Sequence, residues 1–179
     1  MERSPGTEEL DIRIGRVDQL FQTFDPSPFR DRDLDPVATQ YIVDWARERH
    51  RKVPIALRVH VQARRPERET VEHVRDAVST YFAHRAAAAE RELRQLFRLG
   101  RIFLVIGLLI LMLTLAAAEL ITHWFGASRS ISILAESLII LGWVANWRPL
   151  ETFLYEWWPI RRDVLLFRRL ATAQVTVQV

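Results

Sequence analysis

IFLVIGLLILMLTLAAA, residues 102–118, is a run of seventeen residues without a charged side chain. The stretch ISILAESLIILGWVANW, residues 131–147, is nearly as apolar and holds a single acid, Glu136. Each stretch is close to the ~20 residues that a helix needs to cross the roughly 30 Å hydrocarbon layer of a bilayer. Because only a short segment separates them, the two stretches predict a helical hairpin that enters a membrane and returns.

Arginines are distributed unevenly around these two spans. Ten of them lie within 85–101, just before the first span, or within 148–169, just after the second, whereas the connecting segment holds only Arg129. The ten are Arg85, Arg91, Arg94, Arg98, Arg101, Arg148, Arg161, Arg162, Arg168 and Arg169. Under the positive-inside rule, this asymmetry predicts that both chain ends are cytoplasmic and that the hairpin tip is external. The polar, acidic N-terminus is unlike a cleavable signal peptide, so we expect the first span to direct insertion.

The composition limits the class of protein. With 179 residues, the chain has room for a membrane unit and one small domain. The net charge of +3 is modest and does not indicate a nucleic-acid partner. The absence of cysteine excludes disulfides and cysteine–metal sites. Only one of the 25 basic residues is a lysine, a bias typical of a GC-rich bacterial genome, so we expect a bacterial inner membrane protein.

The polar part of the chain shows the alternation of strands and the spacing of helices. Apolar residues alternate within 11–21, 53–61 and 173–179, which predicts three strands. Asp35 and Pro36 predict the start of a helix over 37–48, with Val37, Tyr41, Ile42 and Trp45 on its buried face. A helical connection predicts that the first two strands are parallel. The fold class is therefore an α+β membrane protein, with a small cytoplasmic β-α-β domain, a third C-terminal strand and a two-helix transmembrane hairpin.

A second helical pattern begins near residue 67 and continues through Ala86–Ala89 into the first span, so one long helix is expected there. Pro149 is expected to end the helix of the second span. The resulting organisation is a disordered tail (1–9), a cytoplasmic α/β domain (10–84), a basic juxtamembrane helix (85–101), a first span (102–124), an external loop (125–130), a second span (131–147), an interfacial aromatic and basic segment (148–170) and a strand returning to the sheet (171–179).

The hairpin carries polar residues in a setting where they are costly and often functional. In a hairpin centred between residues 127 and 128, Glu119 and Glu136 are expected to face each other at equal depth. His123 lies one turn from Glu119, and Ser132 lies one turn from Glu136. This intramembrane polar cluster can share a proton or hold a cation, or it can lock the hairpin through hydrogen bonds alone. Locking is the favoured interpretation, because intramembrane carboxylates often pair for packing.

The segment FDPSPFRDRDLDP, residues 24–36, resembles the start of a calcium loop, but Pro36 and Ile42 stand where that loop needs glycine and glutamate. We therefore predict no metal there. A capped turn is expected, with a partner-docking loop as the alternative, since loops often carry recognition. The residues of that loop are Asp25, Phe29, Arg30, Asp31 and Asp33.

Two further groups of residues are candidates for binding. A basic strip formed by Arg58, His60, Arg64 and Arg65 can bind phosphate or an acidic partner, although a solvated strand face is the simpler interpretation. Aromatic residues mixed with arginine favour the lipid headgroup region. The expected headgroup anchors are Arg91, Arg94, Arg98, Arg101, Arg148, Trp157, Trp158, Arg161 and Arg162.

The sequence shows no phosphate loop, dinucleotide motif, zinc-helix motif or nucleophile beside a base, which argues against an enzyme. It predicts no cofactor, small-molecule substrate or nucleic-acid partner. The first functional hypothesis is a non-enzymatic scaffold or regulatory protein that presents its α/β domain to a partner. The alternative is an oligomeric proton or cation pathway that uses the intramembrane carboxylates. Small residues such as Gly107 and Gly142 let helices pack closely, which favours a homo-oligomer or a complex with another membrane protein.

Overall fold

The computed structural model describes residues 8–22, 33–50, 53–62, 68–126 and 128–178. The chain divides into two compact units. The α/β unit comprises residues 1–89 and 162–179, and the hairpin unit comprises residues 90–161. The hairpin unit is thus inserted between the two chain segments that build the α/β unit.

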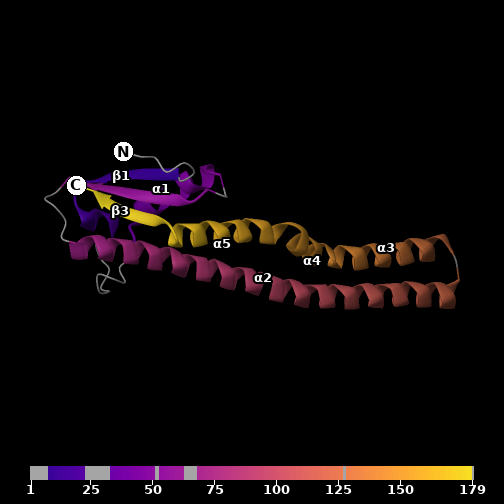
Figure 1. The fold of residues 1–179 in the computed structure, drawn as a ribbon. Helices are drawn as coiled ribbons and strands as arrows, with labels where there is room; N and C mark the ends of the chain where they lie inside the picture. Colours follow the sequence, from indigo (N-terminus) through magenta and orange to yellow (C-terminus); the bar gives the residue numbers. More distant parts are fainter. Residues whose placement is uncertain (1–7, 23–32, 51–52, 63–67, 127, 179) are drawn as a thin grey trace. The chain divides into compact units, whose positions relative to one another are not determined.

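The α/β unit contains a sheet of three parallel strands (Figure 1). Strand β1 (Glu8–Ile14) pairs with β2 (Ile55–Val61), which pairs with β3 (Gln174–Gln178) on its other edge. The parallel pairing of the first two strands and the third C-terminal strand are confirmed. The register places Asp11 beside Arg58, and Arg58 beside Thr176.

One face of the sheet is apolar because each strand alternates. Residues 55, 57, 59 and 61 of β2 are buried, and the residues between them are half-buried. The core on this face also takes side chains from α1 (Pro36–Glu48), from the first part of α2 (Arg68–Phe125) and from α5 (Trp157–Ala171). Phe82 of α2 is fully buried, with its ring stacked 6.4 Å from that of Phe167 of α5.

Helix α1 begins as the sequence predicts. The Asp35 side chain accepts hydrogen bonds from the N–H groups of Val37 (2.9 Å) and Ala38 (3.1 Å), and Pro36 is the first helical residue. The predicted buried face is wrong in part, because Val37 and Tyr41 are 77% and 55% exposed. The buried residues of α1 are Thr39, Ile42, Val43 and Ala46.

The first strand differs from its prediction at both ends. Strand β1 begins at Glu8, inside the segment expected to be a tail, and it ends at Ile14. A short 3-10 helix, η1 (Val17–Leu20), replaces the second half of the predicted strand. Its cause is the Gln19 side chain, whose Oε1 accepts hydrogen bonds from the N–H groups of Gly15 (2.8 Å) and Arg16 (3.2 Å).

The hairpin unit is built on two helices joined by a tight turn. Helix α2 continues to Phe125, and α3 spans Arg129–Ala145. Gly126 adopts the left-handed conformation (φ +72°), as is common after a helix end, and Ser128 caps α3 by accepting a bond from the Ile131 N–H (3.4 Å). The connection is therefore shorter than the predicted loop 125–130.

The chain stays helical after α3. Helix α4 (Trp147–Glu151) leads into a π-helical turn, η3 (Thr152–Glu156), and then into α5. Pro149 therefore does not stop the helical chain, because a proline in the first turn of a helix needs no N–H partner. The predicted interfacial segment 148–170 also differs, since from residue 162 onward it belongs to the α/β unit. Val164, Phe167 and Leu170 are buried in that core.

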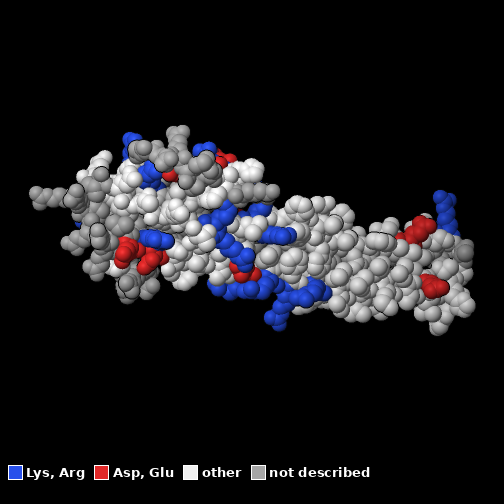
Figure 2. Space-filling view, in the orientation of Figure 1, with Lys and Arg blue, Asp and Glu red and all other residues white. Residues whose placement is uncertain are grey.

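Two helical stretches are long and apolar enough to cross a membrane. Most of their surface is not covered by the chain itself, since only 17% of each apolar window is buried. Met112 and Ile140, for example, are 67% and 62% exposed. In Figure 2 much of the hairpin surface in view carries neither acid nor base. Such an extent of exposed apolar surface is typical of a protein that contacts lipid or another protein.

Candidate functional site

The polar face of the three-stranded sheet carries a cluster of charged and hydrogen-bonding side chains. It lies opposite the apolar core, because alternate residues of a strand point to opposite faces. We call it the open face; its residues are Glu9, Asp11, Arg13, Ala56, Arg58, His60, Gln174, Thr176 and Gln178. The residues from the two outer strands are exposed, and those from β2 are half-buried.

Arg58 is the centre of a charge network on the open face. Its Nη2 lies 2.7 Å from Oε2 of Glu9, and its Nη1 lies 3.7 Å from Oδ1 of Asp11. The same Asp11 oxygen lies 2.9 Å from Nε2 of His60. Because an ionised carboxylate only accepts hydrogen bonds, the His60 nitrogen is the donor. The network therefore joins two strands through side chains as well as through backbone hydrogen bonds.

The Arg58 side chain is more enclosed than its acidic partners, at 23% exposed against 52% for Asp11. Its Nε is buried and has no hydrogen-bond partner within the described residues. The guanidinium group is thus held in one orientation by Glu9 and Asp11. Such a group is suited to recognition, because less conformational entropy is lost when a partner binds.

The hydrogen bond from His60, helped by the charge of Arg58, holds the pKa of Asp11 below its ordinary value. A carboxylate whose folded pKa is lowered stabilises the fold above its unfolded pKa, and the stabilisation is lost as the pH falls through the folded pKa. We therefore expect the wild-type protein to lose more thermal stability between about pH 5 and 3 than an Asp11→Asn variant. Thermal unfolding at pH steps measures this difference. Asp44→Asn, on the exposed side of α1, is the control, and parallel curves for wild type and Asp11→Asn would contradict the prediction.

The predicted basic strip is only partly basic. Arg58 and His60 both contact acids from β1, so the charge of Arg58 is largely matched within the sheet. Arg64 and Arg65 lie outside the described residues. Across the residues that the structure describes, no group of three or more histidine or acidic side chains is placed to hold a metal ion.

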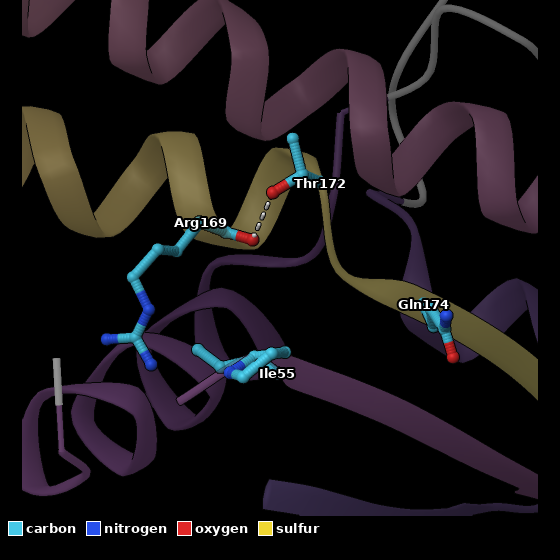
Figure 3. A pocket seen from close by; sticks show the side chains of 5 residues that line it. Ile55, Arg169, Thr172 and Gln174 are labelled. Carbon is cyan, nitrogen blue, oxygen red and sulfur yellow. Dashed lines mark hydrogen bonds between the residues drawn. The ribbon is translucent and has the colours of Figure 1, made fainter. Parts of the chain in front are cut away.

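A small cavity of about 250 Å³ lies where β2 and β3 begin (Figure 3). Pro54, Ile55, Arg169, Thr172 and Gln174 line it. The Arg169 guanidinium extends from α5 and donates from Nη2 to the carbonyl oxygens of His50 (3.2 Å) and Val53 (2.6 Å). Thr172 donates its hydroxyl to the Arg169 carbonyl (3.1 Å), the bond drawn in Figure 3. These polar groups hold the entry to β2 in place, which is a structural role.

Within the hairpin unit, α2 and α3 meet along a seam of partly or fully buried residues. The seam repeats in alternating steps of four and three residues, the spacing of two helices that pack with a left-handed twist. Its members are Leu104, Gly107, Leu111, Thr114, Ala118 and Ile121 on α2, and Ile131, Ala135, Leu138, Gly142 and Ala145 on α3. The small residues Gly107 and Gly142 therefore bring together two helices of the same chain.

Asn146, which follows the last seam residue of α3, is a buried polar residue that the sequence analysis did not single out. It is 6% exposed, and its Nδ2 donates to the carbonyl oxygens of Gly107 and Gly142, each at 3.0 Å. The first of these bonds joins two segments 39 residues apart in the chain. The available signal was an amide at the end of an apolar span, a residue type that often bonds between membrane helices.

The predicted intramembrane cluster is not assembled within one chain. Glu119, His123, Ser132 and Glu136 are all exposed. The two carboxylates make no hydrogen bond or ion pair with any residue that the structure describes. Glu119 follows the seam residue Ala118, and Glu136 follows Ala135, so each lies about 100° around its helix from that seam position. Locking of the hairpin by these residues is not observed, and a pathway formed by several copies stays a prediction.

Most of the expected headgroup anchors are exposed: Arg91, Arg94, Arg98, Arg101, Arg148, Trp158, Arg161 and Arg162. Two of the anchors, Arg148 and Trp157, make close polar contacts within the hairpin unit. Arg148 contacts Glu156 (3.0 Å) and Glu151 (3.3 Å), while Trp157 packs 6.3 Å from the Phe97 ring and donates Nε1–H to the Phe153 carbonyl (2.9 Å).

The predicted docking loop lies mostly outside the described residues. This applies to Asp25, Phe29, Arg30 and Asp31. Asp33 is described and exposed, and its carbonyl accepts a hydrogen bond from the Gln22 N–H at 2.9 Å. Together with the bridge between Phe21 and Leu34, this bond closes the base of the segment.

Comparisons with known proteins do not identify the chain. No model of a protein family matches it. No curated protein and no solved structure matches it either.

Proposed function

We propose that this chain is an integral protein of the bacterial inner membrane that presents its α/β unit on the cytoplasmic side as a non-enzymatic binding module. The partner is a protein that lies on the open face of the sheet. The observation that carries the proposal is a parallel sheet with helices packed on one face and exposed polar side chains on the other.

Parallel sheets are as a rule covered on both faces. Here the open face, which no described helix covers, offers amides and a hydroxyl from β3, namely Gln174, Thr176 and Gln178, beside the ordered charges of Arg58 and its acids. Groups of both signs and neutral hydrogen-bonding groups suit a polar protein surface better than a lipid or a nucleic acid. The chemistry of the face therefore supports a protein partner.

The membrane part of the proposal is supported by the exposed apolar surface of the hairpin unit and by its flanking charges. Large apolar side chains such as Leu113 (69% exposed) and Trp143 (63% exposed) have no cover within the chain. Arginines gather before α2 becomes apolar and after α3, which favours cytoplasmic chain ends.

Site-specific photo-crosslinking in living cells tests the partner. A photoreactive residue at Thr176 is expected to give a discrete adduct with one protein, whereas the same residue at Arg75, an exposed site on α2, is expected to give none. Reversing the central charge with Arg58→Glu is expected to reduce the Thr176 adduct at least about tenfold, because truncating a fixed charge network in an interface typically costs 2 kcal/mol or more. Equal adducts from both sites, or an adduct insensitive to Arg58→Glu, would contradict the proposal.

Because the chain has no cysteine, single cysteines report sidedness without a background signal. With a membrane-impermeant maleimide on intact spheroplasts, Ser130→Cys near the hairpin tip is expected to react, and Thr176→Cys only after permeabilisation. The reverse pattern, or extraction of the protein by alkaline carbonate, would overturn the membrane part of the proposal.

A further inference from the structure

Four arginines form a stripe on α2 immediately before its apolar part. They are Arg91, Arg94, Arg98 and Arg101, spaced by three, four and three residues. At 100° of rotation per residue, this spacing places them within an arc of about 80° on one side of the helix. All four side chains are exposed. We call this set the arginine stripe.

The arginine stripe continues directly into an apolar surface on the same side of the helix. Further steps of four and three residues lead to Val105, Leu109 and Met112, which are 58%, 55% and 67% exposed. The seam with α3 lies on another side, marked by the buried Gly107 and Thr114. The outer side of α2 therefore changes from basic to apolar within about one turn.

These arginines are nearly free of acidic partners in the hairpin unit. Arg91 and Arg98 make no hydrogen bond or ion pair with a described residue. The nearest acidic oxygen to Arg94 is that of Glu90, at 3.9 Å, and Arg101 donates only its Nε to the Phe97 carbonyl (3.2 Å). Arg148 is the contrasting case, since two glutamates surround it. Among the described residues, the stripe thus has a single acidic partner, Glu90 beside Arg94, for its four positive charges.

We propose that the arginine stripe binds the headgroups of anionic phospholipids. Guanidinium groups form paired hydrogen bonds with phosphate oxygens, and their charge favours acidic over zwitterionic headgroups. The stripe extends about 15 Å along the helix axis, whereas one headgroup layer is about 5–8 Å thick. Arg98 and Arg101 therefore contact headgroups, while Arg91 and Arg94 lie in the negative surface potential just beyond them.

This inference rests on the membrane insertion proposed above, so insertion is verified first. The full chain is reconstituted into vesicles of phosphatidylcholine, and flotation on a density gradient measures incorporation. A single cysteine at Gln95, an exposed position beside the stripe, is labelled with an environment-sensitive fluorophore. Brominated phosphatidylglycerol or brominated phosphatidylcholine is then added, and quenching reports which lipid occupies the adjacent sites. The same label at Ser130, near the hairpin tip, shows whether the effect is local.

We expect the label at residue 95 to favour phosphatidylglycerol about tenfold and the label at residue 130 to show a preference below threefold. Changing all four stripe arginines to glutamine is expected to reduce the preference at residue 95 below threefold, and changing them to lysine is expected to retain most of it. The control removes four exposed arginines elsewhere: Arg13, Arg16, Arg75 and Arg129. This control changes the net charge by the same amount as the glutamine variant of the stripe, and it is expected to keep the preference for phosphatidylglycerol at residue 95.

Three results would overturn the inference while flotation still shows insertion. The first is equal quenching by the two lipids in the wild-type chain. The second is an undiminished preference after the glutamine changes. The third is displacement of phosphatidylglycerol by 10 mM inorganic phosphate, which would indicate a site for free phosphate. Failure of flotation would instead count against the proposed function itself.

Discussion

Replacing Gly142 with leucine is expected to separate α2 from α3 and to lower the free energy of unfolding of the hairpin unit by about 2–3 kcal/mol. The structure leaves no room for a side chain there. A Cβ atom at Gly142 would overlap the Thr114 hydroxyl and lie 3.1 Å from the backbone Cα of Leu111. Because one of these neighbours is backbone, the strain cannot be relieved by a rotamer change alone. Thermal unfolding in detergent, followed by tryptophan fluorescence, measures the loss.

The matched control is Ala116→Leu. Ala116 lies on α2 in the same apolar stretch, but it is exposed, so a larger side chain there meets lipid or detergent. We expect its effect to stay within about 0.5 kcal/mol of zero. Combining Gly142→Ala with Thr114→Gly should recover part of the stability lost by Gly142→Ala, because the hydroxyl in the way is gone. Equal effects of Gly142→Leu and Ala116→Leu would show that the seam is not where the helices meet.

Removing β3 by ending the chain after Ala173 is expected to destabilise the α/β unit by about 3–5 kcal/mol, as judged from the burial of two valine side chains. Val175 is buried in the core and Val177 packs against it, while the backbone of β3 pairs with β2. Without β3, the sheet has two strands, and a two-stranded sheet is marginal in water. Amide hydrogen exchange measures the effect, with faster exchange expected at Leu57 and Val59 of β2.

A second variant distinguishes the effect of strand pairing by β3 from the effect of its exposed side chains. Changing the exposed Thr176 and Gln178 to alanine keeps the strand and its buried valines, so protection in β2 is expected to remain. If the truncated chain protected β2 as well as the wild type does, the third strand would contribute little to the unit.

Much of the architecture could be predicted from local patterns. The apolar runs give the two long helices, and the Asp35–Pro36 pair sets the start of α1 through contacts within three residues. The alternation of Val175 and Val177 gives the strand β3. These features depend on interactions between residues that are close in the sequence, so the sequence alone predicts them.

The missed features depend on contacts between distant segments. Asn146 bonds to Gly107, and nothing near either residue in the sequence indicates the other. Glu119 and Glu136 are exposed because the residues just before them, Ala118 and Ala135, occupy the seam. Centring the hairpin on its turn predicts that the two residues have equal depth, but it does not predict which side of each helix faces the seam. The end of β1 is set by the side chain of Gln19, a polar residue whose local bonds compete with the sheet.

The insertion of the hairpin unit into the α/β unit has a consequence for biosynthesis. β2 leaves the ribosome more than one hundred residues before β3, its neighbour in the sheet. In a chain whose hairpin spans a bilayer, β3 can reach β2 only after the second helix has crossed back. A chain stalled with one helix inserted keeps an unpaired strand edge, of the kind that proteases and chaperones recognise. In such a chain, the sheet can be completed only after the second helix has inserted, so membrane insertion and folding of the α/β unit are coupled.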